Sequence, residues 1–191
     1  AASSDYPLRD VYKRQAFGHS IFADGAGAVV IGRTDSPDTG YIGSQLLTDG
    51  TQFDFIGVYA GGTKMPITAN VLLNNQQGLL SLKPLPGDRN LRLWPMVVHK
   101  LLDKYGMQIA EIDHFIFTQI NHSVIVNVMA ELGVTIDKTT TVMDKYAYTG
   151  SGCVPMAFHH AVSVGKIKRG DKVVFMASGA GLAVGSNLFV Y

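Results

Sequence analysis

The chain has 191 residues, of which 47% are hydrophobic and 16% charged, and its formal net charge is +1. A chain of this length can bury one well-formed core or two small ones. The near-neutral charge argues against nucleic acid and against an anionic membrane as partners. The low share of charged residues predicts elements that are buried on more than one side, as in a sheet covered by helices on both faces.

The single cysteine, Cys153, excludes a disulfide bond within the chain and favours a reducing, cytoplasmic setting. No apolar run reaches the ~18 residues that a transmembrane helix needs. The N-terminal residues also lack the charged-then-apolar order of a signal peptide. We therefore expect a cytoplasmic protein without a membrane partner.

Residues 1–15 differ from the rest of the chain, because they are polar and show no hydrophobic period. Within them Asp10–Gln15 reads DVYKRQ, which is the translation of a transposon-end adapter used in preparing DNA libraries. We expect this leader to be non-native, the alternative being an ordinary disordered tail. On the first interpretation the natural protein extends further upstream and the chain is a fragment.

The next segments predict a short run of structure and then a long insert. Ser20–Gly32, SIFADGAGAVVIG, predicts a glycine-rich turn followed by a β-run. Its DGAGA precedes a strand and lacks the Lys-Ser/Thr pair of a phosphate-binding loop, so we interpret the glycines as permitting close packing. The polar turn Arg33–Thr39 is the best domain boundary. Gly40–Thr48 is predicted as a strand, and Asp49–Pro86 as an irregular insert of the kind that forms lids, partner surfaces or substrate walls.

Three apolar segments with helical spacing follow the insert. The first helix is expected either to run from about Trp94 to Tyr105 or to have a kink near Trp94, because Pro95 fits a first turn and would break a helix that ran through from Asp88. The other two helices are expected at Ile120–Leu132 and Cys153–Val164. Left-handed C-caps are expected just behind the three helices, at Gly106, Gly133 and Gly165.

A strand is expected after each helix, at His114–Thr118, Thr139–Met143 and Lys172–Ala177, with Gly185–Tyr191 as a closing hairpin partner. The repeated order of helix, glycine and strand favours a largely parallel sheet with right-handed crossovers. Functional residues gather in polar loops at strand ends in α/β domains. Three such loops are 117–121 (FTQIN), 143–155 (MDKYAYTGSGCVP) and 177–185 (ASGAGLAVG).

Several of these motifs, taken in order, resemble a known family. They are FADGAGAVVIG, MDKYAYTGSGCVPMAF, GKIKRGDKVVF and ASGAGLAVGSNLFVY. Together they resemble the C-terminal part of the β-ketoacyl-acyl-carrier-protein synthase III group, which has the thiolase-like fold. The resemblance covers 20–191 and is weakest at 50–90. It implies an α/β fold with a mixed sheet covered by helices, in which 16–39 ends an N-terminal half and 40–191 forms the C-terminal half-domain.

The resemblance also implies a chemistry. In that family a cysteine in the first half attacks an acyl thioester, and His and Asn side chains then donate hydrogen bonds that stabilise an enolate. The resemblance places the His position on Thr118 and the Asn position on Tyr148, and it matches Ala180 to a backbone N–H donor in the glycine-rich oxyanion loop. Thr and Tyr hydroxyls can each donate one hydrogen bond. The alternative is that both positions changed after catalysis was lost.

Further positions follow from the same resemblance. The substrate-binding positions that it implies are Gln119, Asn121, Thr149, Gly179 and Gly181. The nucleophilic cysteine is expected to be absent from this chain, since Cys153 falls where the family has Ala or Ser, and a buried structural role is expected for Cys153. None of the six histidines is expected to replace the catalytic one.

The function implied is that of an acyltransferase of fatty-acid or polyketide type. It would take acyl-CoA or acyl-carrier-protein thioesters as substrates, use no cofactor or metal, and work as a homodimer or heterodimer. The alternative is a catalytically silent thiolase-fold subunit that partners an active condensing enzyme. The basic run Lys166, Lys168, Arg169 and Lys172 is interpreted as a solvated turn rather than a docking patch.

Overall fold

A computed structural model describes residues 20–191 of the chain. The expected leader at 1–15 and the histidine at position 19 lie outside the described residues. The described chain divides into two compact units. The larger unit contains Phe22–Thr48, Gly87–Gly179 and Ala183–Tyr191, and the smaller contains 20–21, Asp49–Pro86 and Ala180–Leu182.

A four-stranded sheet forms the centre of the larger unit, with the strand order β1-β6-β5-β4. Its strands are β1 (Gly40–Thr48), β4 (His114–Phe117), β5 (Lys172–Gly179) and β6 (Ala183–Val190). Only β4 and β5 pair in parallel, whereas β1–β6 and β5–β6 are antiparallel. The expectation of a largely parallel sheet is therefore wrong. Only a short turn separates β5 from β6, and a short turn can join only antiparallel neighbours.

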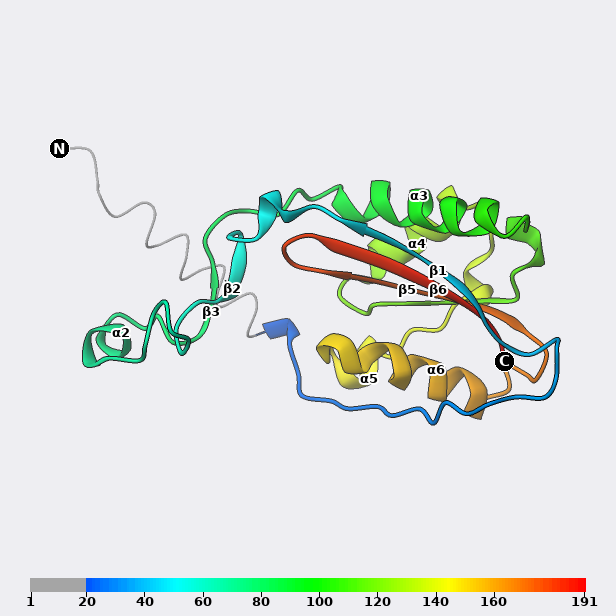
Figure 1. Ribbon diagram of the computed structural model, residues 1–191, viewed down its shortest axis with the longest axis horizontal. Coiled ribbons are helices and arrows are strands. Elements are labelled where there is room, and N and C mark those ends of the chain that lie inside the picture. The colour runs from blue at the N-terminus through cyan, green and yellow to red at the C-terminus, as the bar shows by residue number, and fades with distance from the viewer. Residues whose placement is uncertain (1–19) are drawn as a thin grey trace. The chain divides into compact units, whose positions relative to one another are not determined.

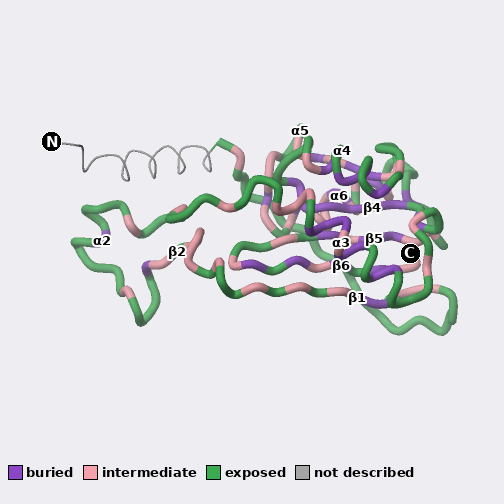
Figure 2. Tube along the Cα trace, turned by 90° about the horizontal axis from the view of Figure 1, so that it is seen from above, coloured by how far each residue is buried: buried purple, intermediate pink, exposed green. Residues whose placement is uncertain are grey.

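Helices cover both faces of this sheet (Figure 1). One face carries α3 (Arg89–Lys104) and α4 (His122–Glu131), and the other carries α6 (Cys153–Ser163). The buried residues concentrate on the central strands and on the helix faces that meet them (Figure 2). Trp94 of α3 stacks on Phe117 of β4 with a centroid distance of 5.3 Å, and both are fully buried. Helices on both faces of the sheet agree with the low share of charged residues in the sequence.

The helix α3 begins at Arg89 and runs through Pro95, so the expected start near Trp94 is wrong. Proline inside a helix removes one backbone hydrogen bond and usually disfavours the preceding turn. Here the residues around it are buried, including Leu93, Trp94, Val97 and Val98. Burial of this apolar face is the favourable term that offsets the lost hydrogen bond.

Apart from the start of α3, the helix ends lie close to the positions predicted from the sequence. α4 begins behind its N-cap Asn121, and α6 begins at Cys153 as expected. Gly106, Gly133 and Gly165 follow the three long helices with φ values of 64°, 69° and 74°. These are left-handed conformations, which confirms the expected C-caps.

The segment 139–142 is not a strand, although one was expected at Thr139–Met143. It makes a single parallel bridge, Phe115 to Thr139. The Gln119 side chain takes the place of further pairing: its amide donates to the carbonyl oxygens of Phe117 at 2.9 Å and Thr140 at 3.3 Å, and its carbonyl oxygen accepts from Val142 N–H at 2.9 Å. The carbonyl of Thr140 and the N–H of Val142 are thus satisfied without a ladder.

The loop expected at 143–155 contains short helical turns. They are α5 (Met143–Tyr146) and the 3₁₀ turn η4 (Gly150–Gly152), which leads directly into α6. Two other 3₁₀ turns, η2 (Ile109–Glu111) and η3 (Ile136–Lys138), connect the α-helices to the segments that follow. Tyr148 lies between α5 and η4.

The β-run expected within Ser20–Gly32 does not form a strand in the described chain. The segment runs extended beside α6 (Figure 1), and Val30 is fully exposed. Its glycines do permit close packing, although against α6 rather than a sheet: a Cβ on Gly27 would lie 2.6 Å from Pro155 Cγ. A Cβ on Gly25 would lie 2.6 Å from Thr149 Cβ.

The smaller unit is mostly the segment expected to be an irregular insert. It contains the 3₁₀ turn η1 (Gly50–Gln52), the antiparallel strands β2 (Ile56–Val58) and β3 (Leu79–Ser81), and the short helix α2 (Ala69–Leu73). Lys83 forms an ion pair with Asp54 at 2.7 Å across this hairpin. None of the described helices has the length and apolar character needed to cross a bilayer.

Candidate active site

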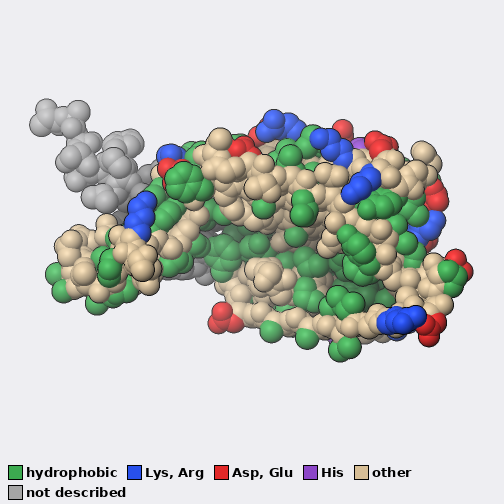
Figure 3. Space-filling model, in the orientation of Figure 1, with side chains coloured by type: hydrophobic (Ala, Val, Ile, Leu, Met, Phe, Trp, Pro, Cys, Tyr) green, Lys and Arg blue, Asp and Glu red, His purple; other side chains and the backbone are tan. Residues whose placement is uncertain are grey.

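A cavity of about 650 Å³ lies in the larger unit, between the sheet and the first turn of α6. Hydrophobic side chains gather on this side of the molecule, between α3 and α6 (Figure 3). Residues lining the cavity include Leu46, Thr48, Thr118, Tyr148, Ser151, Phe175, Ser178, Gly179, Ala183, Gly185 and Asn187. An apolar hollow with a few polar groups is the usual form of a small-molecule site.

Thr118 reaches the cavity from the carboxyl end of β4. Its backbone N–H donates to Met176 O at 2.9 Å, which continues the parallel pairing for one more residue. The side chain is 3% exposed. Its hydroxyl donates to the Tyr148 hydroxyl at 3.4 Å, a long hydrogen bond. The structure thus brings the two positions of the expected donor pair together on one cavity wall.

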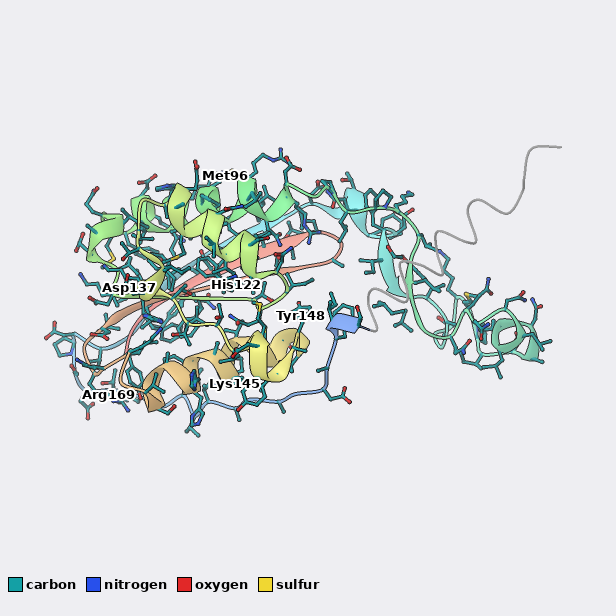
Figure 4. The ribbon with its side chains drawn as sticks, turned by 180° about the vertical axis from the view of Figure 1, so that it is seen from behind. Met96, His122, Asp137, Lys145, Tyr148 and Arg169 are labelled. Atoms are coloured by element: carbon teal, nitrogen blue, oxygen red, sulfur yellow. The ribbon has the colours of Figure 1, made fainter. Side chains whose placement is uncertain are left out.

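Tyr148 is held by the first described residues of the larger unit. Its carbonyl oxygen accepts from Ala23 N–H at 3.0 Å, and its ring lies 5.4 Å from the Phe22 ring. Figure 4 shows Tyr148 at the end of α6 that faces this segment. The side chain is half-buried, so its hydroxyl is both positioned by protein and accessible from the cavity.

Cys153 lies directly behind this pair and is fully buried. Its sulfur accepts from Gln119 N–H at 3.3 Å and lies 3.5 Å from Thr118 Oγ1. Since Thr118 donates its own proton to Tyr148, the Cys153 S–H is the group that can donate to Thr118. The result is an ordered hydrogen-bond chain from Gln119 N–H through Cys153 and Thr118 to Tyr148, whose proton remains free to point into the cavity. Such chains polarise their last donor.

The other implied substrate-binding side chains are engaged in the fold. Gln119 is 1% exposed, and its side chain forms hydrogen bonds with the backbone of Thr140 and Val142. Asn121 caps α4, where its Oδ1 accepts from Ser123 N–H at 3.0 Å. Thr149 is buried and its hydroxyl donates to Met156 Sδ at 3.4 Å. None of the three lines the cavity.

The glycine-rich loop is divided between the two units. Gly179 ends β5 and lines the cavity. Ala180 and Gly181 belong to the smaller unit, and Gly181 has a φ of 121°, which favours glycine. The role of the Ala180 N–H as an oxyanion donor therefore stays a prediction.

None of the histidines among residues 20–191 lines the cavity that contains Thr118 and Tyr148. His114 is 2% exposed at the start of β4, and its Nε2 lies 2.9 Å from Thr140 Oγ1. Burial, helped by the positive charge of Lys166, lowers the pKa of His114 to about 4. His122 and His160 line a second, smaller cavity of about 330 Å³ that also contains Thr139 and Lys166.

Two further residues were not indicated by any sequence motif. Arg89 and Asn90 begin α3, and Asn90 Oδ1 accepts from the hydroxyl of Ser178, a cavity residue, at 3.3 Å. Arg89 is half-buried, and its Nη1 is buried without a hydrogen-bond partner in the described chain. Burial lowers the pKa of its guanidinium, an effect that the nearby Tyr148 opposes. An arginine in the first turn of a helix has no sequence signature, so only the fold reveals it.

Among residues 20–191 no three His, Cys, Asp or Glu side chains lie close enough together to hold a metal ion. What the cavity offers chemically is a neutral hydroxyl donor, Tyr148, supported from behind by a second hydroxyl and a thiol. Such a donor stabilises negative charge that develops on a substrate oxygen. The apolar walls around it strengthen that interaction by excluding water.

Comparison with known proteins agrees with this architecture. Residues 102–191 match the family described as 3-oxoacyl-[acyl-carrier-protein] synthase III C terminal. The β-ketoacyl-[acyl-carrier-protein] synthase III of Aliarcobacter butzleri is 34% identical over 180 residues, which are 90% of this chain and 51% of that protein. The enzyme of the same name from Caldanaerobacter subterraneus is 32% identical over 168 residues, or 88% of this chain and 50% of that protein. The chain thus spans about half the length of these relatives.

Solved structures show the same fold. The 3-oxoacyl-[acyl-carrier-protein] synthase III of Aquifex aeolicus superposes with a TM-score of 0.66 over 83% of this chain and 46% of that chain, at 22% identity. The Pseudomonas aeruginosa protein gives the same TM-score over 83% of this chain and 47% of its own, at 20% identity. The chain therefore has the thiolase-like fold, and its residues 102–191 match the C-terminal family of the β-ketoacyl-acyl-carrier-protein synthase III enzymes, which the chain as a whole resembles.

Proposed function

We propose that the intact protein is an acyltransferase that condenses or transfers acyl groups from CoA or acyl-carrier-protein thioesters, as a homodimer or heterodimer. The observation that carries the proposal is the hydrogen bond of 3.4 Å between Thr118 and Tyr148 on the wall of one cavity. Two positions that are 30 residues apart in sequence meet there, where the resemblance places the donor pair of the family.

In this proposal Tyr148 replaces the usual donors at the second-substrate site. Its hydroxyl donates to the thioester oxygen as negative charge develops there, and Thr118 and Cys153 hold it in register. The nucleophilic cysteine comes from chain outside these 191 residues, since Cys153 is fully buried and its sulfur is occupied as an acceptor. In this proposal the thioester substrates are the only other reactants.

The test uses the product of the complete gene. The purified protein is incubated with acyl-CoA, and its intact mass is measured before and after hydroxylamine treatment. We expect one acyl group per protomer, attached to a cysteine other than Cys153 through a thioester bond that hydroxylamine cleaves, leaving the free thiol and an acyl hydroxamate. Transfer of that group to a second thioester then shows condensation or acyl exchange.

A second candidate function rests on the same two residues. If Thr118 and Tyr148 replaced a catalytic His and Asn after activity was lost, the protein is a silent thiolase-fold subunit that partners an active condensing enzyme. That protein would take no acyl group from any thioester tested. Absence of an adduct on the complete, folded protein would therefore reject the acyltransferase and favour the silent subunit.

A further inference from the structure

The first turn of α3 lies at the rim of the cavity and carries an unpaired charge. Asn90 fixes this turn to the cavity through its hydrogen bond of 3.3 Å with Ser178. Arg89 directly precedes Asn90 in this turn, next to the residue that contacts the cavity wall. Burial lowers the pKa of the Arg89 guanidinium, and the cavity residue Tyr148 opposes that fall, which agrees with this placement.

No acidic side chain of the described chain pairs with Arg89. The neighbouring acid, Asp88, lies 3.9 Å from the exposed Arg92 instead. Meanwhile Nη1 of Arg89 is buried and without a hydrogen-bond partner among residues 20–191. A guanidinium does not lose its proton in proteins, so the unmet group is a positive charge with a free N–H donor.

A buried N–H donor without a partner is costly, and a ligand oxygen that accepts from it removes that cost. The planar guanidinium fork matches two oxygens of a carboxylate or a phosphate. Both groups occur in the substrates of the proposed reaction, the carboxylate on a dicarboxylic acyl group and the phosphate on the thioester carrier. The ligand chemistry that fits Arg89 is thus an oxyanion presented beside Tyr148.

We propose that Arg89 is a specificity-determining residue that binds an oxyanion of the second substrate at the Tyr148 cavity. This inference rests on the proposed function for the identity of the substrate, but not for the existence of the anion site. Binding through Arg89 positions the thioester oxygen against the Tyr148 hydroxyl. If the oxyanion is a carboxylate of the acyl group, the proposal predicts selection for charged over uncharged acyl thioesters of the same shape.

The experiment measures binding without turnover, by calorimetric titration of the purified protein with malonyl-CoA and isovaleryl-CoA. The two acyl groups have nearly the same shape, but only malonyl carries a carboxylate. We expect the wild type to prefer malonyl-CoA, and Arg89→Gln to weaken malonyl-CoA binding about 10- to 100-fold, as expected for one charge-assisted hydrogen bond or a bidentate pair. Unchanged isovaleryl-CoA binding would then identify the carboxylate as the anion, whereas an equal loss for both ligands would identify a phosphate.

Arg92→Gln is the matched control, because Arg92 is one turn further along α3 and is 68% exposed. It should leave both affinities unchanged. Arg89→Lys keeps the positive charge but lacks the planar fork, so its affinity for malonyl-CoA should lie between those of the wild type and Arg89→Gln. This variant also keeps the proposal testable if Arg89→Gln folds poorly. Unchanged binding of both thioesters by either Arg89 variant, or a wild type that binds both alike and is not inhibited by inorganic phosphate, overturns the proposal.

The outcomes separate this inference from the proposed function. Arg89-dependent binding of an oxyanion without any acyl adduct would reject the acyltransferase and keep the anion site. If Arg89→Gln leaves the rates of acylation and condensation unchanged, the acyltransferase proposal stands and the anion site is rejected.

Discussion

The backbone N–H of Ala23 donates to the carbonyl oxygen of Tyr148 at 3.0 Å, so the segment that enters the larger unit holds the residue that lines its cavity. The same segment passes so close to α6 that Gly152 has no room for a side chain: a Cβ there would lie 2.7 Å from Gly25 O. The glycines of DGAGA and of TGSG therefore face each other across one tight contact. The position of Tyr148 depends on this contact.

Replacing Gly25 by Ala should disturb this contact. The new Cβ would lie 2.6 Å from Cβ and Cγ2 of Thr149, a stiff and buried side chain. We expect a loss of about 1–3 kcal/mol in the free energy of unfolding, measured by urea denaturation. Gly32→Ala is the control, because nothing lies within 4 Å of a Cβ at that position. Equal stability of the two variants would show that the contact is loose.

Tyr148→Phe should separate catalysis from stability. The ring contact with Phe22 remains, but the last proton of the hydrogen-bond chain is lost, so we expect condensation by the intact protein to fall about 100- to 1000-fold. The free energy of unfolding should change little. Tyr146→Phe serves as the control, since Tyr146 is 49% exposed and lies outside the cavity. If Tyr148→Phe condenses substrates as fast as the wild type, Tyr148 has no part in the mechanism.

Cys153 should be inert in the folded protein. It is fully buried, and its sulfur already accepts a hydrogen bond from Gln119 N–H. We expect no reaction with iodoacetamide under native conditions and rapid reaction in urea, followed by mass spectrometry of the peptide that contains it. Native labelling, or an acyl group found on Cys153, would contradict the structural role described for it.

His114 should make stability depend on pH. Burial holds its pKa at about 4 in the folded protein, below the ordinary value of 6.5, so between these values the unfolded chain takes up a proton that the folded protein does not. Stability is therefore complete above about pH 6.5 and falls as the pH drops towards 4, by about 3 kcal/mol at most. Urea denaturation at several pH values measures this slope. His114→Gln should flatten it in that window, and an unchanged slope would show that other groups cause it.

Much of the fold was predictable from the sequence because local signals decided it. The strand Gly40–Thr48 and the helix beginning at Cys153 lie where they were predicted, and the glycines behind the helices adopt the left-handed conformation. These features depend on periodicity and on backbone freedom, which neighbouring residues encode.

Other features depended on contacts between residues distant in sequence. The segment 139–142 carries β-branched residues, but the Gln119 side chain occupies the backbone groups that a ladder would need. Likewise the resemblance implied that Thr118 and Tyr148 would each donate a hydrogen bond to the substrate. In the structure Thr118 donates to Tyr148 instead, so the Tyr148 hydroxyl proton is the one left free. Arg89 was missed because its significance lies in a buried Nη1 without a hydrogen-bond partner among residues 20–191, a property that only the three-dimensional surroundings define.

The floor of the cavity is built from elements other than those that carry the hydrogen-bond chain. Leu46 on β1 and Gly185 on β6 both line it, and a Cβ on Gly185 would lie 2.8 Å from Leu46 Cδ2. A bulkier residue at position 185, or a smaller one at position 46, thus alters depth while Thr118, Cys153 and Tyr148 keep their geometry. The depth of the cavity and the hydrogen-bond chain at its wall are therefore separable features of this scaffold, and selection or engineering can change one without rebuilding the other.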